Sequence, residues 1–345
     1  MDLNNLIRKN IQQMKAYSSA RDEYKEFQAD MVFLDANENP FDNSLNRYPD
    51  PQQAALKALI SDQKEVALDQ ILLGNGSDEV LDLIFRAFCE PNSDNILTLP
   101  PTYGMYDVLA NLNAIENIQV PLSSDFQIEV DLVIENIKPN TKLLFICSPN
   151  NPSGNTVDRS AIERLLKAFN GLIVIDEAYI DFTEETSWTQ FLNVYPNLIV
   201  VQTLSKAYGL AGIRLGICYA SKEIIAVLNK IKPPYNVNTL TQEAAVKALH
   251  NKDVVSDQIA SILNERIRLK KALTAYSFIK KIYPSEANFF LIKVDDANKR
   301  YDELIKNGIV VRNRSSQLHC DNCLRITVGS PSENTQLLTL LKTLK

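Results

Sequence analysis

Residues 198–216 read LIVVQTLSKAYGLAGIRLG, an apolar run followed by a loop with one lysine and three glycines. Four successive apolar residues are typical of a central parallel strand, because both faces of such a strand are covered. Most lysines are solvated surface charges, but Lys206 follows this strand among small and apolar residues. Burial lowers the pKa of a lysine, and a neutral amine can attack an aldehyde to form a Schiff base. The segment therefore predicts an α/β fold with a reactive lysine beyond a strand end.

Short apolar runs alternate with helical patterns from about residue 70 to residue 220. This alternation predicts a mostly parallel central sheet flanked by helices. The expected strands are residues 71–73, 96–99, 143–147, 172–175, 198–202 and 216–220.

A second, smaller α+β domain is expected after Pro233 and Pro234, which interrupt helix formation. The pattern there predicts a long helix, strands at 288–294, 309–312 and 324–328, a helix at 298–306 and a final helix. A capping box, Ser330-Pro331-x-Glu333, marks the start of the last helix. We expect residues 1–40 to form an arm joining the small domain, 41–245 the large ligand-binding domain, and 246–345 the small domain.

The composition of the 345 residues excludes several classes of protein. A net charge of -6 argues against nucleic-acid or anionic-membrane partners, which need a basic face. No apolar run is long enough to span a bilayer, and the first residues lack a signal-peptide pattern. Five scattered cysteines do not suggest a disulfide framework, and His319-Cys320-x-x-Cys323 has no second pair to complete a zinc site. A cytoplasmic protein without a metal is expected.

Seven of the ten glycines fall in four short loops that follow strands. In open α/β sheets the ligand lies beyond the carboxyl ends of the strands, where glycine lets the backbone approach it. The first loop, residues 74–79, reads GNGSDE and precedes a helix. Free backbone N–H groups at a helix start suit a phosphate, although a tight turn explains this loop equally well.

Two further loops place polar side chains at strand ends. Residues 148–154 read SPNNPSG, in which two prolines hold an asparagine amide rigidly at the sheet edge. Asp176 ends a buried run and could cap the next helix or hold a protonated ring nitrogen, with Tyr179 close by. Arg214, Ser205 and Thr203 could donate hydrogen bonds to a phosphate near the lysine.

Several motifs occur in the order found in one enzyme family. They are LDANENP (34–40), RYPDP (47–51), PPTYGMY (100–106), NNP (150–152), DEAY (176–179), SKA (205–207) and LRITVG (324–329). Over essentially its whole length the chain resembles the fold-type I pyridoxal-phosphate enzymes, and among them the histidinol-phosphate aminotransferase family. The resemblance implies pyridoxal 5′-phosphate as the cofactor, within residues 41–245, and a homodimer.

The resemblance also implies roles for individual residues. Lys206 would carry the cofactor as a Schiff base and then move the proton, with Asp176 and Tyr179 as the other catalytic groups. Asp176 would pair with the ring nitrogen, and Asn151 and Tyr179 with the ring hydroxyl oxygen. Tyr103 would stack on the ring. The phosphate contacts and their neighbours would be Gly76, Ser77, Asp78, Thr203, Ser205 and Arg214, together with Tyr48 of the partner subunit. The substrate contacts would be Arg325, Arg312, Tyr17, Asn37 and Asn151.

The implied reaction moves an amino group between L-histidinol phosphate and 2-oxoglutarate, giving imidazole acetol phosphate and glutamate in histidine biosynthesis. Three alternatives stay open. A decarboxylase acting on threonine phosphate would need similar anion recognition, and an aromatic amino-acid aminotransferase would share the cofactor contacts. A regulator that binds the cofactor without turnover is the third, although no helix-turn-helix pattern or basic stripe supports it.

Overall fold

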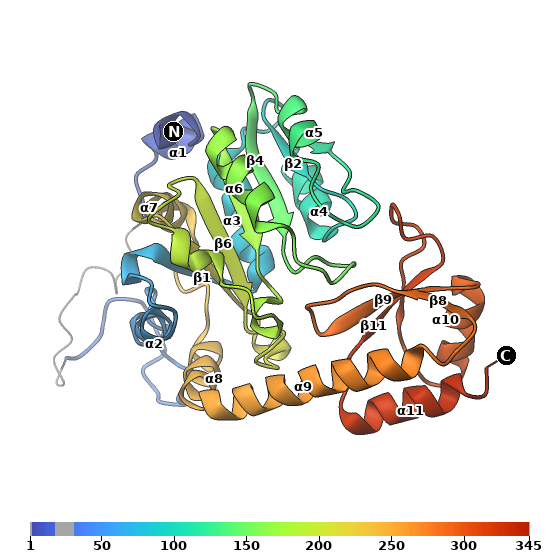
Figure 1. The fold of residues 1–345 in the computed structure, drawn as a ribbon. Helices are drawn as coiled ribbons and strands as arrows, with labels where there is room; N and C mark the ends of the chain where they lie inside the picture. The colour runs from blue at the N-terminus through green and yellow to red at the C-terminus, as the bar shows by residue number, and fades with distance from the viewer. Residues whose placement is uncertain (1, 18–30, 345) are drawn as a thin grey trace.

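The computed structural model describes residues 2–17 and 31–344, and two β-sheets organise this part of the chain (Figure 1). The larger sheet has seven strands in the order β1-β7-β6-β5-β4-β2-β3. They are β1 (Ile71–Asn75), β2 (Asn95–Thr98), β3 (Glu116–Gln119), β4 (Thr141–Cys147), β5 (Leu172–Asp176), β6 (Leu198–Thr203) and β7 (Leu215–Ala220). β7 runs in the opposite direction to the other six strands, which all run the same way. The predicted mostly parallel sheet is therefore confirmed.

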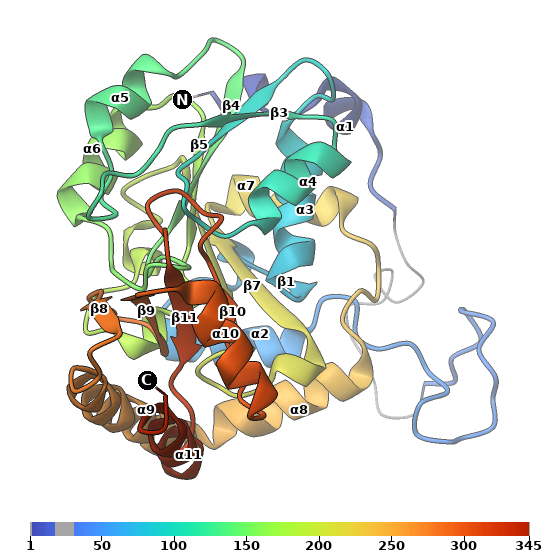
Figure 2. The ribbon, with the colours of Figure 1, turned by 90° about the vertical axis from the view of Figure 1, so that its right-hand side faces the viewer.

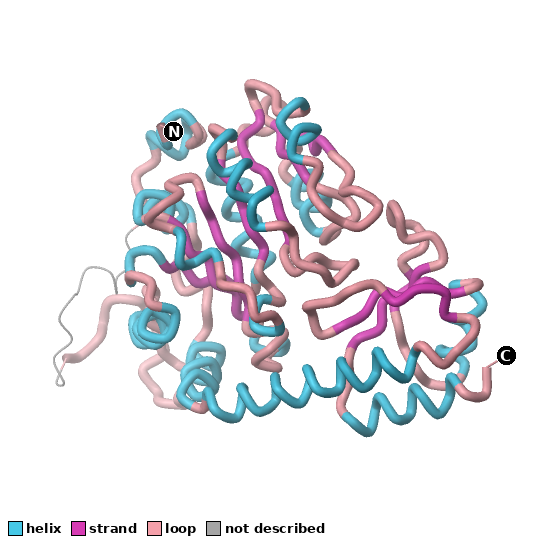
Figure 3. Tube along the Cα trace, in the orientation of Figure 1, coloured by secondary structure: helices cyan, strands magenta, loops and turns pink. Residues whose placement is uncertain are grey.

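Helices cover both faces of this sheet (Figure 3). Alternate residues of β5 enter different cores: Ile173 and Ile175 on one face, Leu172 and Val174 on the other. The first core is closed by α2 (Ala54–Lys64), α5 (Val130–Glu135), α6 (Arg159–Ala168) and α8 (Thr239–His250). The second is closed by α3 (Ser77–Phe88), α4 (Met105–Leu112) and α7 (Lys222–Ile231). The continuous apolar runs in the sequence follow from this two-sided burial.

The smaller sheet is antiparallel, with the order β10-β11-β9-β8. Its strands are β8 (Ile279–Ile282), β9 (Phe289–Val294), β10 (Arg312–Asn313) and β11 (Cys323–Thr327). The helices around it are α9 (Lys252–Leu273), α10 (Ala297–Lys306) and α11 (Pro331–Leu341), and the predicted capping box at Ser330 is present. Figures 1 and 2 show α9 running from α8 to this second unit. The boundary predicted between residues 245 and 246 falls within α8, and the domain division stays a prediction.

The first residues of the chain pack on the large sheet's helices. A 3-10 helix (Leu3–Asn5) and α1 (Lys9–Gln13) bury Leu6 and Ile11. The Arg8 amide donates to the Ala87 carbonyl at the end of α3, at 3.1 Å. Within residues 2–13 the arm therefore differs from the expectation that it joins the small domain, because its apolar side chains cover α3 and α7 instead. No helix in the described ranges is long and apolar enough to cross a membrane.

Candidate active site

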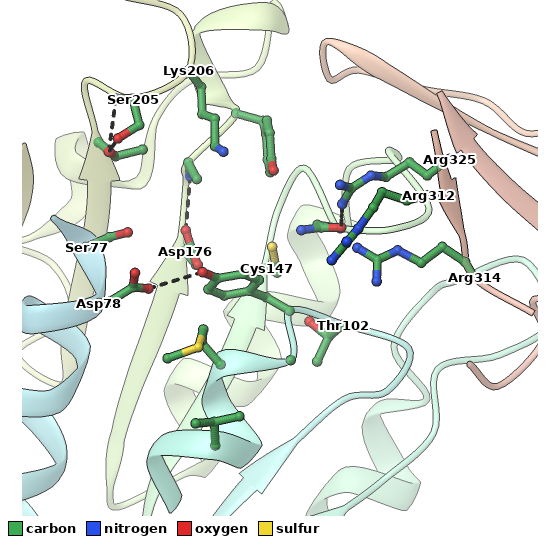
Figure 4. Close-up of a pocket in the computed structure, with 18 of the residues that line it drawn as sticks. Ser77, Asp78, Thr102, Cys147, Asp176, Ser205, Lys206, Arg312, Arg314 and Arg325 are labelled. Atoms are coloured by element: carbon green, nitrogen blue, oxygen red, sulfur yellow. Dashed lines mark hydrogen bonds between the residues drawn. The ribbon is translucent and has the colours of Figure 1, made fainter. Parts of the chain in front are cut away.

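A cavity of about 510 Å³ lies at the carboxyl ends of the central strands and opens toward the small sheet (Figure 4). The last residues of β4, β5 and β6 (Cys147, Asp176 and Thr203) line it, together with the start of α3. A volume of this size accommodates a small organic ligand. Twelve of the predicted site residues line this cavity: Ser77, Asp78, Tyr103, Asn151, Asp176, Tyr179, Thr203, Ser205, Lys206, Arg214, Arg312 and Arg325.

Lys206 extends into the cavity from the loop that follows β6. Its side chain is exposed to the cavity, and its Nζ lies 5.8 Å from the centre of the Tyr179 ring. Desolvation by the cavity walls, and then the charge of Arg325, lower the pKa of this amine below its ordinary value. A larger share of Lys206 is therefore neutral at a given pH than of a solvated lysine, as attack on an aldehyde requires.

Asp176 ends β5 and is only 4% exposed. Its Oδ2 accepts a hydrogen bond from the Tyr106 hydroxyl at 2.7 Å, and its Oδ1 accepts one from the Ala178 amide at 3.1 Å. Burial raises the pKa of the carboxyl group, and the hydrogen bond from Tyr106 opposes that rise. Among the described residues Asp176 has no cation in an ion pair. A buried carboxylate with donors but no counterion fits the protonated nitrogen of a bound ring.

An anion cradle forms where α3 begins. Gly76 adopts a φ of +84°, and a Cβ there would lie 2.6 Å from Nη2 of Arg214. A Cβ on Gly216 would lie 2.3 Å from the Ser77 amide nitrogen. The two glycines thus let Arg214 and the helix start approach one another, and Ser205 lines the same side of the cavity. Amide groups at a helix start, hydroxyls and a guanidinium are the donors that a phosphate requires.

Aromatic and amide side chains surround the space between Lys206 and Asp176. Tyr103 is half-buried, and its hydroxyl donates to Oδ1 of Asp78 at 3.1 Å. Tyr179 is buried, and burial raises the pKa of its phenol, so the group stays a hydrogen-bond donor. An amine, a buried acid, an aromatic wall and an anion cradle together fit pyridoxal 5′-phosphate, the cofactor expected from the sequence.

Three arginines enter the cavity from the small sheet (Figure 4). Arg312 of β10 lies opposite Arg325 of β11 in the antiparallel register, and Arg314 follows directly after β10. Arg325 donates through Nη1 to the side-chain oxygen of Asn151. Positions 312 and 314 share a face because side chains alternate along an extended chain. This spacing was the available sequence signal for Arg314, which sequence reasoning missed.

Other residues of the site were also absent from the sequence prediction, including Tyr106, which contacts Asp176 but is not among the residues that line the cavity. Tyr106 gave no functional signal, because an aromatic on the apolar face of a helix is explained by core packing. Its contact with Asp176 appears only when α4 is placed against β5. The remaining unpredicted residues that line the cavity are Thr102, Gly104, Met105, Val108, Cys147, Ala178 and Gln317.

Of the four predicted residues that do not line this cavity, Gly76 belongs to the cradle described above, and the other three lie elsewhere in the single chain. Tyr48 and Asn37 line a separate pocket of about 570 Å³, where Tyr48 stacks on Tyr235 with ring centres 4.5 Å apart. Tyr17 lines another pocket beside α7. The place of Tyr48 in the partner's site stays a prediction. One chain does not bring Tyr17 or Asn37 to Lys206, and residues 18–30, which lie between them, are outside the described ranges.

Cys320 and Cys323 are buried in the large core beside Tyr283. The Cys323 amide donates to the Cys320 carbonyl at 2.9 Å, so the two residues form a tight turn before β11. Within residues 2–17 and 31–344, no group of three His, Cys, Asp or Glu side chains could hold a metal ion. The cysteine pair thus packs the hairpin that carries the arginines.

Comparison with known proteins gives close matches over the whole chain. The family model of class I and II aminotransferases matches residues 22–341. A histidinol-phosphate aminotransferase of Flavobacterium psychrophilum is 60% identical over 343 residues, which cover 99% of each chain. The crystal structure of the histidinol-phosphate aminotransferase from Clostridium acetobutylicum superposes with a TM-score of 0.80 at 28% identity, covering 87% of this chain and 90% of that one. An L-threonine-O-3-phosphate decarboxylase from Porphyromonas gingivalis superposes with a TM-score of 0.74 at 25% identity, covering 87% and 91%.

Proposed function

The chain belongs to the class I and II aminotransferases, and on that premise we propose that it moves an amino group between L-histidinol phosphate and 2-oxoglutarate. The products are imidazole acetol phosphate and glutamate, and the reaction is a step of histidine biosynthesis. Pyridoxal 5′-phosphate is the cofactor of the family. The observation that carries the proposal is a reactive lysine in one cavity with a cluster of arginines. The 60% identical relative supports the choice of substrate.

The large domain would hold the cofactor. When bound, pyridoxal phosphate supplies an electron sink for the bond-breaking step at the substrate's α-carbon. Lys206 would hold its aldehyde carbon, and the carboxylate of Asp176 would keep the ring nitrogen protonated. Asn151 and Tyr179 would orient the ring oxygen. The phosphate would occupy the cradle formed by the start of α3, by Ser205 and by Arg214.

Lys206 is proposed as the group that moves the proton. Its pKa is lowered, so a larger share of the amine is the neutral base than in a solvated lysine. The loop after β6 holds its amine beside the substrate space, which turns proton transfer into an intramolecular event. The ring of Tyr179 lies beside the amine, with its centre 5.8 Å from Nζ. The protein thus contributes the position of the Lys206 amine and the charges around it.

Arg325 and Arg312 would hold the anionic group of each substrate. A guanidinium presents two parallel N–H groups, which match two oxygens of either a phosphate or a carboxylate. Asn151 already contacts Arg325 and fixes its direction. One site could therefore accept the phosphate monoester of the amino donor and the carboxylates of the acceptor in turn.

We include a homodimer in this proposal, with Tyr48 completing the phosphate contacts of the neighbouring subunit. Tyr48 is 52% exposed and lies outside its own chain's cavity. Large apolar side chains in the same segment, Val32, Leu34 and Phe41, are more than 80% exposed, as expected of a surface that a second copy covers. All five cysteines are unpaired, which supports the reducing cytoplasm as the compartment.

A spectroscopic half-reaction assay on the purified holoprotein tests the proposed function. Histidinol phosphate should convert the cofactor absorbance to that of the aminated form, and 2-oxoglutarate should restore it. Release of carbon dioxide from threonine phosphate would favour the decarboxylase, a rival supported by the structural likeness to the Porphyromonas enzyme. Conversion by phenylalanine or tyrosine alone would instead identify an aromatic amino-acid aminotransferase.

A further inference from the structure

We propose that Arg314 is a third anion-binding residue of the substrate site, and that it favours a doubly charged phosphate monoester over a carboxylate. This inference rests on the proposed function and deepens it, because it names the residue that separates the two substrates. Arg314 follows β10, and its side chain lies beside those of Arg312 and Arg325 (Figure 4). It lines the same cavity as Lys206.

The backbone of Arg314 is anchored, whereas its side chain has no hydrogen-bond or ion-pair partner among the described residues. Its amide donates to the Cys323 carbonyl at 2.8 Å, and its carbonyl accepts from the Gln317 amide at 2.9 Å. Its Nε is buried and makes no hydrogen bond within the described part of the chain. A buried donor without a partner costs free energy, so it normally has a partner in the working state. Removing this guanidinium breaks no hydrogen bond within residues 2–17 and 31–344.

The three arginines also lack a counterion. None of Arg312, Arg314 and Arg325 forms an ion pair with a described residue. Burial, and then the charges of Arg325 and Arg312, lower the pKa of the Arg314 guanidinium. Like charges that are held together without an acid destabilise the protein alone, and an anion in the cavity would relieve that repulsion. Such an arrangement is typical of a binding site rather than of a structural ion-pair network.

The charge of the cluster matches the single phosphate group of the amino donor better than either separate carboxylate of the acceptor. A carboxylate carries one negative charge and two oxygens, which one guanidinium satisfies in bidentate fashion. A phosphate monoester carries nearly two charges and three terminal oxygens above its second pKa of about 6. Arg325 and Arg312 are enough to bind the two oxygens of a carboxylate. A phosphate has a third terminal oxygen and more negative charge, which Arg314 would bind. Loss of Arg314 should therefore affect the two half-reactions unequally.

The test compares Arg314→Gln and Arg314→Lys holoenzymes with the native enzyme and with Lys306→Gln. Lys306 is exposed on α10 and does not line the cavity, so its replacement removes one charge from the same part of the molecule. In Arg314→Gln, kcat/KM for the half-reaction with histidinol phosphate should fall about 10- to 100-fold, the range for one hydrogen bond to a charged group. The value for glutamate should change less than about threefold, and Arg314→Lys should recover part of the loss.

The pH profile separates recognition from a structural role. In the native enzyme and Lys306→Gln, kcat/KM for histidinol phosphate should rise as the monoester loses its second proton near pH 6, at about the second pKa of a phosphate ester. Arg314→Gln should flatten that rise. Equal losses for the two half-reactions, or an unchanged profile, would overturn the inference.

Inorganic phosphate and acetate, used as inhibitors of the glutamate half-reaction, distinguish this inference from the proposed function. Arg314→Gln should weaken inhibition by phosphate about tenfold or more and leave inhibition by acetate unchanged. If the native enzyme does not react with histidinol phosphate but Arg314→Gln shows this difference in inhibition, the proposed substrate is refuted and the role of Arg314 stands. Equal weakening for both anions, or none, would refute that role whatever the substrate.

Discussion

The two regions that we propose bind anions, at opposite sides of one cavity, are built in different ways. The cradle at the start of α3 uses backbone amides, close-packed glycines and Arg214, whose Nη2 lies 3.4 Å from Oδ2 of Asp78. The cluster on β10 and β11 uses guanidinium groups alone, with no acid among the described residues to balance them. A rigid cradle, in which Asp78 partly neutralises the charge of Arg214, suits an anion that stays bound. An unbalanced set of long side chains suits anions that are exchanged in every cycle.

Replacing Arg325 with Gln should give the largest effect and sharpen this comparison. Because Arg325 would contact both substrates and is tied to Asn151, kcat/KM should fall about 100-fold or more for histidinol phosphate and for glutamate alike. Affinity for pyridoxal phosphate should stay as in the native protein. Kinetics of both half-reactions, with cofactor titration, give the measurement. A fall in kcat/KM for only one of the two substrates would contradict the assignment of Arg325 to both.

Replacing Arg214 with Gln should have the opposite effect, weaker cofactor binding with little change in substrate kinetics, and the effect should be smaller. Arg214 is about half exposed, so loss of its contact should weaken cofactor binding about 10- to 30-fold. With the cofactor saturating, KM for glutamate should change little. Equilibrium titration of the apoprotein measures the effect, with Arg164→Gln, an exposed arginine remote from the cavity, as the matched control. Weaker substrate binding with unchanged cofactor affinity would show that the two regions were interchanged.

The pH dependence of Lys206 should show the smallest effect. A lowered pKa means that its neutral amine appears at lower pH than that of a free, solvated lysine side chain. In the apoprotein, labelling by an amine reagent should therefore reach its full rate at lower pH for Lys206. Because the charge of Arg325 contributes to that shift, Arg325→Gln should move the curve to higher pH. Competitive labelling against free Nα-acetyl-lysine, read by mass spectrometry, tests this, and coincident curves for Lys206 and the free amine would contradict it.

The parts that were predictable from sequence are those whose physical cause is local. Asp176 was singled out because it directly follows an apolar run, although helix capping explained it equally well, and Lys206 because it comes a few residues after another such run. The central strands were found for the same reason, whereas β3 and β8 were missed because both are partly exposed and carry polar residues. An edge strand of that kind has neither a continuous apolar run nor a clear alternation.

The parts that were missed depend on contacts between distant segments. Tyr106 gains its role only through a strand 70 residues away in sequence. Arg314 becomes informative only when the hairpin faces the cavity and its side chain is found without a hydrogen-bond partner in residues 2–17 and 31–344. The arm was placed beside the small domain because its helical spacing shows an apolar face but not what that face covers. Local patterns therefore located the large domain's contribution to the site better than the small domain's.

The central claim is that the amine of Lys206 carries the cofactor between the two anion-binding regions. Borohydride reduction of the holoprotein, followed by peptide mapping, tests it most directly. The account predicts one pyridoxyl group per chain, attached to Lys206, and no label in Lys206→Ala treated in the same way. A label on another lysine, or an unlabelled native chain, would contradict it.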